Sequence, residues 1–371
     1  MNPCRMCAVL VMLIGGLRSA FAAADEAEGF TPMFNGQDLA GWVNVNCAPG
    51  TFFVKGEEVI TNGNPTGFLR TARQYENFIL ELDWMHVNTS EVGNSGLFVW
   101  GDALPAVGTP YTRGIEVQVL VNLEYKDPKT GAITATSQGD VFSIWGAKCT
   151  PDRPHPLGWE RCLPSENRAK GGGEWNHYKV VANDGTIKLA VNGTEVSGVS
   201  NCSPRKGYLA LESEGAECHF RNVKIQELPT TNPQPAEIAK LDEGHTSLFD
   251  GLTLDGWEFW TPPGYSSDHG WKAAGGRLTA VGTDFLSTKK EFGPCELIFD
   301  WMLPADAENP QCTVSVGGQK RTVQLPQGTK PGSWQRHTLK VEKVAGLAAI
   351  QILPAPGLEL MNLFVRESKS K

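Results

Sequence analysis

Two stretches decide the fold: GNSGLFVW at residues 93–100 and GIEVQVL at residues 114–120. Both alternate with a period of two, which places successive side chains on opposite faces of a β-sheet. In the second stretch the aliphatic side chains share one face, and Glu116 and Gln118 lie together on the other. This polar pair indicates either an open sheet face that meets a polar ligand or the wet outer face of a half-buried strand.

The rest of the chain is also typical of short strands. It contains 41 Gly and 24 Pro in 371 residues, and no segment keeps a helical apolar period over three turns. Short strands separated by turn signals predict an antiparallel β-sandwich. Residues around Glu195 and at 201–206 are expected to form solvated loop. We expect strands in the first half at 52–54, 58–61, 68–71, 78–87, 95–100, 114–120, 175–183, 186–191, 207–213 and 219–226.

Four segments recur in the same order, which indicates two copies of one fold. FNGQDLAGW at 34–42 returns as FDGLTLDGW at 249–257, and GEWNHYKV at 173–180 returns as GSWQRHTLKV at 332–341. LELDWM at 80–85 and the closing strand at 219–225 have counterparts at 297–302 and 360–365.

The interval between the LELDWM-like segment and the GEW-like segment is much shorter in the second copy, where it covers residues 303–331, than in the first, where it covers 86–172. The second copy is expected to lack a counterpart of the Glu116 strand. Chemistry is therefore expected in the first copy, and a scaffold or binding role in the second.

The N-terminus has the pattern of a secretory signal peptide. Arg5 precedes an apolar run at 8–17 and small residues at 19–24, and no later run approaches the length of a membrane span. The expected organisation is a signal peptide (1–24), a first sandwich (25–229), a Pro-rich linker (230–240) and a shortened second sandwich (241–371). The location expected is secreted, periplasmic or cell-surface. The formal charge of −8 argues against nucleic acid as a partner.

Seven cysteines follow the signal segment. Export permits disulfides, and the spacing allows local pairs of Cys149 with Cys162, Cys202 with Cys218, and Cys295 with Cys312, which leaves Cys47 over. Sequence alone leaves the connectivity open. No Cys or His spacing of the zinc type occurs after the signal segment.

The motifs of the first copy resemble the 3-keto-disaccharide hydrolase family. They are FNG at 34–36, NSGLF at 94–98, EVQVL at 116–120, GEWNHY at 173–178 and VNG at 191–193. The resemblance implies an all-β fold of two tandem concanavalin A-like jelly rolls, the second degenerate. It also implies a glycoside or oligosaccharide substrate carrying a ketone at sugar carbon 3. That ketone acidifies the C2 proton, so a general base can form an enolate that expels the aglycone from C1 before water adds.

Three residues are candidates for this chemistry. Glu116 is the first choice for the base, or for a carboxylate that orients it; otherwise it is an outward side chain on a wet face. His86, at the end of the 78–87 strand, is a candidate acid, base or metal ligand, with a structural role as the alternative. Asp140 is a candidate second carboxylate.

Six further residues are candidates for substrate binding. Arg70 could bind the enolate or a hydroxyl, or form a salt bridge, and His155 is held between two prolines, which suits a site or a loop equally. No cofactor is demanded by the spacing, although a divalent metal in a pocket of His, Glu and Asp stays open. The binding candidates are Gln118, Arg70, Asn94, Trp100, Trp145 and His155.

Two positions depart from the resembled pattern. Val121 stands where related sequences often carry Asp, and Gln138 where a His is common. Leu120, at the third polar position, gives no support to a retaining mechanism with two carboxylates on this strand. The competing hypothesis is a carbohydrate-binding, lectin-like envelope protein without catalytic activity.

Overall fold

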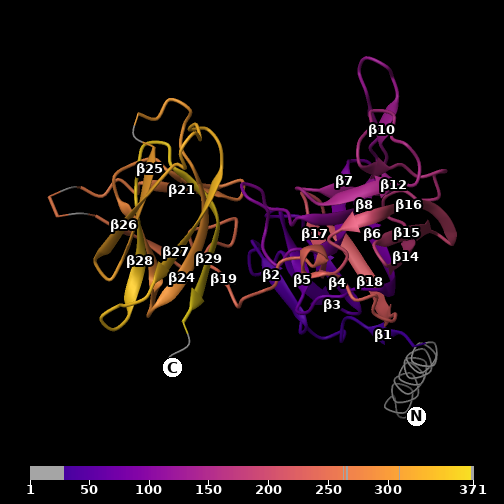
Figure 1. Cartoon of the computed structure of the whole chain (residues 1–371), viewed down its shortest axis with the longest axis horizontal. Coiled ribbons are helices and arrows are strands. Elements are labelled where there is room, and N and C mark those ends of the chain that lie inside the picture. The colour runs from indigo at the N-terminus through magenta and orange to yellow at the C-terminus, as the bar shows by residue number, and fades with distance from the viewer. Residues whose placement is uncertain (1–28, 262, 265, 309, 369–371) are drawn as a thin grey trace, which may run out of the picture.

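The computed structural model describes residues 29–261, 263–264, 266–308 and 310–368. The expected signal peptide lies outside these residues. Two β-sandwiches stand side by side, one built from the first half of the chain and one from the second (Figure 1). The all-β prediction is confirmed, since the described residues add only one short 3-10 helix, η1 (Pro235–Glu237). None of the described helices is long and apolar enough to span a membrane.

The first jelly roll consists of two antiparallel sheets. The back sheet has nine strands, in the order β12 (Lys148–Pro151), β16 (Thr194–Ser203), β15 (Thr186–Val191), β14 (Asn176–Asn183), β6 (Phe78–His86), β18 (Cys218–Glu227), β4 (Glu58–Thr61) and β3 (Phe52–Lys55), with β1 (Thr31–Pro32) beside β18. The front sheet has seven, in the order β13 (Arg161–Cys162), β11 (Gln138–Ile144), β8 (Gly114–Val121), β7 (Gly93–Gly101), β17 (Tyr208–Ser213), β5 (Gly67–Thr71) and β2 (Trp42–Val45). A hairpin of β9 (Tyr125–Lys126) and β10 (Ile133–Ala135) projects from this half (Figure 1).

Period-two alternation builds the core between these sheets. In β6 every second side chain is buried, beginning with Phe78, and the inward face of β8 contributes Ile115, Val117 and Val119 to the same cluster. Burying such aliphatic and aromatic side chains stabilises the fold by about 1.5–3 kcal/mol each. The opposite face of β8, which carries Glu116 and Gln118, therefore turns away from the core.

The second jelly roll repeats the central topology of the first. The sheet on the side of the first jelly roll has the strand order β21 (Trp271–Ala274), β22 (Arg277–Ala280), β29 (Glu359–Glu367), β24 (Cys295–Met302) and β27 (Gln335–Val341), with β19 (Thr246–Ser247) beside β29. Its distal sheet runs β20 (Trp257–Trp260), β23 (Phe285–Phe292), β28 (Ala348–Leu353), β25 (Gln311–Val316) and β26 (Gln319–Gln324).

This topology corrects one expectation from the sequence. The strand order β20-β23-β28-β25-β26 matches β2-β5-β17-β7-β8, so β26 is the counterpart of β8. It was missed because β26 has the sequence QKRTVQ, is mostly exposed, and carries Lys320 and Arg321 but no carboxylate.

Two further expectations are wrong. Residues 194–203, expected in part as loop, form β16, whose central residues are buried against β15 and β12. The local disulfides that the spacing allows do not form: all seven described cysteines are free thiols. Most of these cysteines are buried in the cores, where each thiol packs as a small apolar group.

The two jelly rolls meet through the outer face of the front sheet. A separate apolar cluster joins Val45, Phe68, Phe98 and Ala210 of the first to Phe364 of β29 in the second. The connecting segment also lies on the first jelly roll, because Ala103 N–H donates to Lys240 O and Ala239 N–H donates to Lys206 O. The second jelly roll therefore covers part of the face that carries Glu116.

Candidate functional site

A pocket of about 200 Å³ lies on the outer face of the front sheet, beside the region covered by the second jelly roll. The register places Phe98 opposite Glu116, Gly96 opposite Gln118, and Phe142 on the other side of Glu116. Neighbouring strands thus bring polar side chains from β7, β8 and β17 to one surface. The lining residues are Asn94, Tyr111, Glu116, Gln118, Phe142, Trp145, Glu212 and Glu214.

Three carboxylates meet in this pocket. Gly96 makes room for two of them, since a Cβ there would lie 3.0 Å from Glu116 Oε1 and 2.9 Å from Glu212 Oε2. Glu214 accepts hydrogen bonds from the Tyr111 hydroxyl (2.6 Å) and from Asn94 Nδ2 (2.5 Å). Like charges at this spacing repel one another, which favours the protonated form of the carboxyl groups that are most deeply buried.

Burial and mutual repulsion shift the acidity of two of them. Glu116 is 8% exposed, and burial, together with the charges of Glu214 and Asp140, raises its pKa to about 8, although Arg161 opposes the shift. Burial and the charges of Glu116 and Glu214 raise the pKa of Glu212 well above its ordinary value. Glu212 Oε2 is buried without a hydrogen-bond partner. Perturbed carboxyls grouped in a pocket are typical of acid–base sites.

Arg161 lies at the edge of this group. Its Nε donates to Asp140 Oδ2 at 2.6 Å, its Nη2 to Gln118 Oε1 at 3.2 Å, and its guanidinium stacks on the Phe142 ring. Asp140 is fully buried and is also held by Thr136. Asp140 therefore holds Arg161 in place and does not line the pocket.

An aromatic pair forms one wall of the pocket. Tyr111 and Trp145 stack with ring centroids 6.0 Å apart and planes 12° apart, and Trp145 is 52% exposed. An exposed indole beside polar groups suits stacking against the apolar face of a sugar ring. Gln118 is held nearby, with its Nε2 donating to Asn94 Oδ1 at 3.0 Å.

The structure brings Glu116, Gln118, Asn94 and Trp145 together but separates the other candidates. His86 is buried in the core, where Nε2 lies 3.0 Å from Val119 O and Nδ1 lies 3.2 Å from Glu217 O, and burial lowers its pKa. In β6 His86 follows the same alternation as Trp84 and points into the core, so it lies on the opposite side of the front sheet from Glu116.

Three binding candidates also have structural roles. Arg70 is 1% exposed, and its guanidinium group donates hydrogen bonds to Asp242 (2.6 Å), Ala103 O and Thr71 O. Trp100 is in the core and donates to Glu76 O. His155 Nε2 contacts Thr134 O, its Nδ1 accepts from Leu157 N–H, and its ring stacks on Trp159.

The sequence interpretation missed Glu212, Glu214, Tyr111 and Arg161. A signal existed for the first two: LESE at residues 211–214 alternates, so both glutamates share a face once the strand pairs with β7. Tyr111 and Arg161 come from connections whose position only the tertiary structure determines.

The two departures from the resembled pattern lie close to this site but not in it. Val121 is buried in the core, and Gln138 pairs with Val119 at the far end of β8 and contacts Asn167. Among the described residues, the trio Glu243, His245 and Glu296 is the group whose ligand atoms are close enough for a metal, within 4.8 Å of one another, and it lies between the jelly rolls.

Several known proteins resemble this chain. A 3-keto-disaccharide hydrolase from Bacteroides thetaiotaomicron is 22% identical over 251 residues, covering 55% of this chain and 80% of that protein. A candidate glycosyl hydrolase from Parabacteroides distasonis has a TM-score of 0.42 at 23% identity, covering 56% of this chain and 97% of the other. A carbohydrate-binding module from Bacillus subtilis has a TM-score of 0.36 at 15% identity, covering 50% and 96%.

The first jelly roll as a whole matches a known domain family. The match to the 3-keto-alpha-glucoside-1,2-lyase-like domain spans residues 29–226, more than half of the chain. It includes every strand that lines the pocket, and together with the relative's name it supports a carbohydrate hydrolase-like function. Through its first jelly roll, the chain belongs to the 3-keto-alpha-glucoside-1,2-lyase-like domain family.

Proposed function

We propose that this protein is an exported enzyme that cleaves 3-keto-glycosides in the pocket of the first jelly roll. The observation that carries the proposal is the carboxyl group of Glu116, whose pKa of about 8 suits a general base that works near neutral pH. The family match supports the substrate class.

In the proposed reaction Glu116 takes the proton from C2 of the oxidised sugar. The electron pair of that C–H bond forms the enolate, and collapse of the enolate breaks the C1–O bond. The glycosidic oxygen takes the proton back from the Glu116 carboxyl group and leaves as an alcohol, which regenerates the base. Glu212, kept neutral by burial, is suited to donate a hydrogen bond to the developing oxyanion at C3. Water then adds across the C1–C2 double bond, which makes the net reaction a hydrolysis.

The remaining pocket residues bind and orient. The Trp145 and Tyr111 rings would stack against the sugar, while Gln118 and Asn94 offer amide groups to its hydroxyls. Burial raises the pKa of the base, and the charge of Glu214, which Tyr111 and Asn94 hold nearby, adds to this effect. Activity is expected to rise with pH as the carboxyl group ionises.

The test is turnover of 3-keto-glucosides and 3-keto-disaccharides by the purified protein, with unoxidised glucosides as the substrate control. Glu116→Gln should lower kcat by about a hundredfold or more, the usual contribution of a general base. Glu174→Gln, which changes an exposed glutamate outside the pocket, is the matched control.

Exchange in D₂O adds a direct readout, because deuterium should enter C2 of the product. A chelator arm determines whether a divalent cation takes part. A wild-type protein that binds these sugars but leaves them intact would instead favour the lectin-like alternative.

A further inference from the structure

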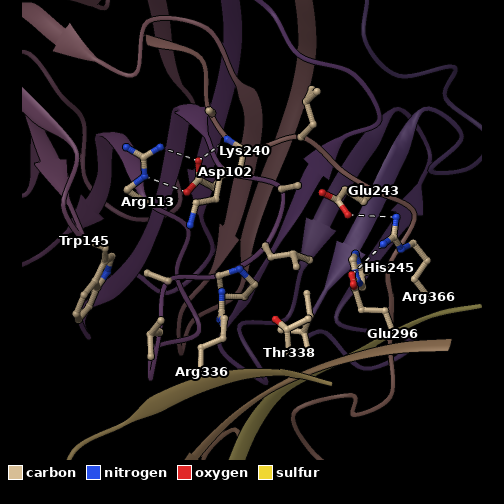
Figure 2. A pocket seen from close by; sticks show the side chains of 18 of the residues that line it. Asp102, Arg113, Trp145, Lys240, Glu243, His245, Glu296, Arg336, Thr338 and Arg366 are labelled. Carbon is tan, nitrogen blue, oxygen red and sulfur yellow. Dashed lines mark hydrogen bonds and ion pairs between the residues drawn. The ribbon is translucent and has the colours of Figure 1, made fainter. Parts of the chain in front are cut away.

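A second, larger space lies between the two jelly rolls. It is a cleft of about 970 Å³, lined by the connection after β7, the connecting segment at 235–245, and strands β24, β27 and β29 (Figure 2). Trp145 lines this cleft as well as the carboxylate pocket. The two spaces therefore share one exposed indole, which places them next to each other.

Basic side chains outnumber acidic ones in the cleft, although the whole chain carries a formal charge of −8. The acidic lining residues are Asp102, Glu243 and Glu296, and the basic ones, apart from His245, are Arg113, Lys240, Arg336, Lys340 and Arg366.

The acids are already paired within the cleft. Arg113 binds Asp102 through two contacts of 2.9 Å, and Arg366 contacts Glu243 at 3.2 Å and Glu296 at 2.9 Å (Figure 2).

Arg336 contacts Asp300 at 2.7 Å and Lys340 contacts Glu296 at 3.4 Å, so within the part of the chain that the structure describes one of the five basic side chains is left without an acidic partner. Among the described residues, the Lys240 ammonium group makes no ion pair, and the hydrogen bonds of this residue use its main chain: its N–H donates to Asp102, and its carbonyl accepts from Ala103. Lys240 is exposed and lines the cleft. A charge that makes no structural contact within a basic cleft is available to a negatively charged ligand.

The same charges argue against a cation in this cleft. Glu243, His245 and Glu296 have the spacing of metal ligands, but Glu296 Oε1 already accepts from Arg366 Nη2 and lies 3.2 Å from His245 Nε2. A metal ion here would have to displace the guanidinium group, which fills the same position between the two carboxylates. The donor set does not fit a metal as it stands.

We propose that the cleft binds a carboxylate on the leaving group of the glycoside that the carboxylate pocket cleaves. This proposal rests on the proposed function and names its substrate class: glycosides whose aglycone is a uronic acid or an aromatic acid. The oxidised sugar occupies the pocket, the glycosidic bond passes Trp145, and the carboxylate of the aglycone meets Lys240.

The test uses two matched 3-keto-glucosides, one with a 4-carboxyphenyl and one with a 4-carbamoylphenyl aglycone, and measures the ratio of their kcat/KM values. Lys240→Gln should lower this ratio about fivefold relative to wild type, as expected for one partly exposed charge pair. Lys240→Glu should lower it further. The two aglycones differ in leaving-group ability, but this difference is the same for wild type and each variant, so it cancels when their kcat/KM ratios are compared. Lys55→Gln, an exposed lysine outside both spaces, should keep the wild-type ratio.

Binding of the two unoxidised glucosides, measured calorimetrically, tests the cleft without chemistry. The carboxylate ligand should bind more tightly than the carboxamide in a Lys240-dependent way that weakens with salt. If no 3-keto substrate is turned over but this preference persists, only the proposed function fails. Equal ratios in wild type and Lys240→Gln, or equal affinity for the two ligands, would overturn the carboxylate site. A 3-keto-glucoside with a glucuronic acid aglycone distinguishes uronic from aromatic acids.

Discussion

Asp300 in β24 of the second jelly roll accepts a hydrogen bond of 2.9 Å from the main-chain N–H of Gly108 in the first. Asp300 is fully buried and also binds Arg336 through contacts of 2.7 and 2.9 Å. Asn362 of β29 adds a hydrogen bond to Thr109 O at 3.0 Å. The connection that supplies Tyr111 to the pocket is therefore held from one side by the second jelly roll, which gives that degenerate copy a positioning role.

Gly108→Ala should loosen this connection. Gly108 has φ +72°, and a Cβ would lie 2.4 Å from the Cβ and Cγ of Trp334 in the second jelly roll. Gly36→Ala is the matched control, because Gly36 has φ +71° with nothing near its Cβ position. Both variants should lose about 1–2 kcal/mol of unfolding free energy from backbone strain. Gly108→Ala should lose additional unfolding free energy because of the clash with Trp334, and it should also lower kcat/KM. If the two variants lose the same unfolding free energy and the same activity, the positioning role is contradicted.

Trp145→Ala should weaken substrate binding without destabilising the fold. The side chain is 52% exposed and stacks on Tyr111 at the pocket wall, so we expect KM to rise about threefold to tenfold. Trp159→Ala is the control, since Trp159 is 49% exposed and stacks on His155 outside the pocket. Steady-state kinetics and thermal unfolding of both variants check this prediction. An identical KM in the two variants would remove Trp145 from the site.

Stability should depend on pH through Glu116. Its pKa is raised from 4.5 to about 8 by burial and by Glu214, so between these values the folded protein holds a proton that the unfolded chain releases. The free energy of unfolding therefore falls as pH rises through this window, by about 1.4 kcal/mol per pH unit for one such group.

Glu116→Gln replaces the titrating carboxyl group with an amide that binds no proton in this range. The unfolding free energy of this variant should therefore fall less steeply than that of wild type between about pH 5 and pH 8. Chemical denaturation at several pH values measures the difference, with Glu174→Gln expected to follow wild type. Parallel curves for wild type and Glu116→Gln would show that Glu116 ionises normally in the folded protein.

The cysteines should behave as free thiols. All seven in the described part of the chain are unpaired, and burial raises the pKa of Cys149 to about 11. We expect unreduced, denatured protein to react with a thiol reagent at all seven of these positions. The native protein should react slowly, because the thiolate is the reactive form and these groups are buried and protonated. Mass spectrometry of alkylated peptides would reveal any pair that forms instead.

Much of the fold could be predicted because its signals are local. Alternation placed β4 at residues 58–61, β8 at 114–121 and β15 at 186–191 almost to the residue, and the Asn-Asp-Gly sequence at 183–185 is typical of the turn that joins β14 to β15. The strands β16 and β26 were missed because polar and small residues interrupt their patterns. Gly198 and Asn201 in β16 and Lys320 and Arg321 in β26 are typical of loops when judged without their partners.

The sequence by itself determined two tandem β-sandwiches, a family for the first, and Glu116 and Gln118 on an outward face. Only the tertiary structure decided which charges surround Glu116, because Glu212 and Glu214 reach it across β7 from a strand that lies about ninety residues away in sequence. It also placed His86 and Arg70 in structural contacts and brought the second jelly roll against the loop of Tyr111. A strand's period selects a face, whereas the neighbours on that face depend on pairing between distant segments, which local pattern does not encode.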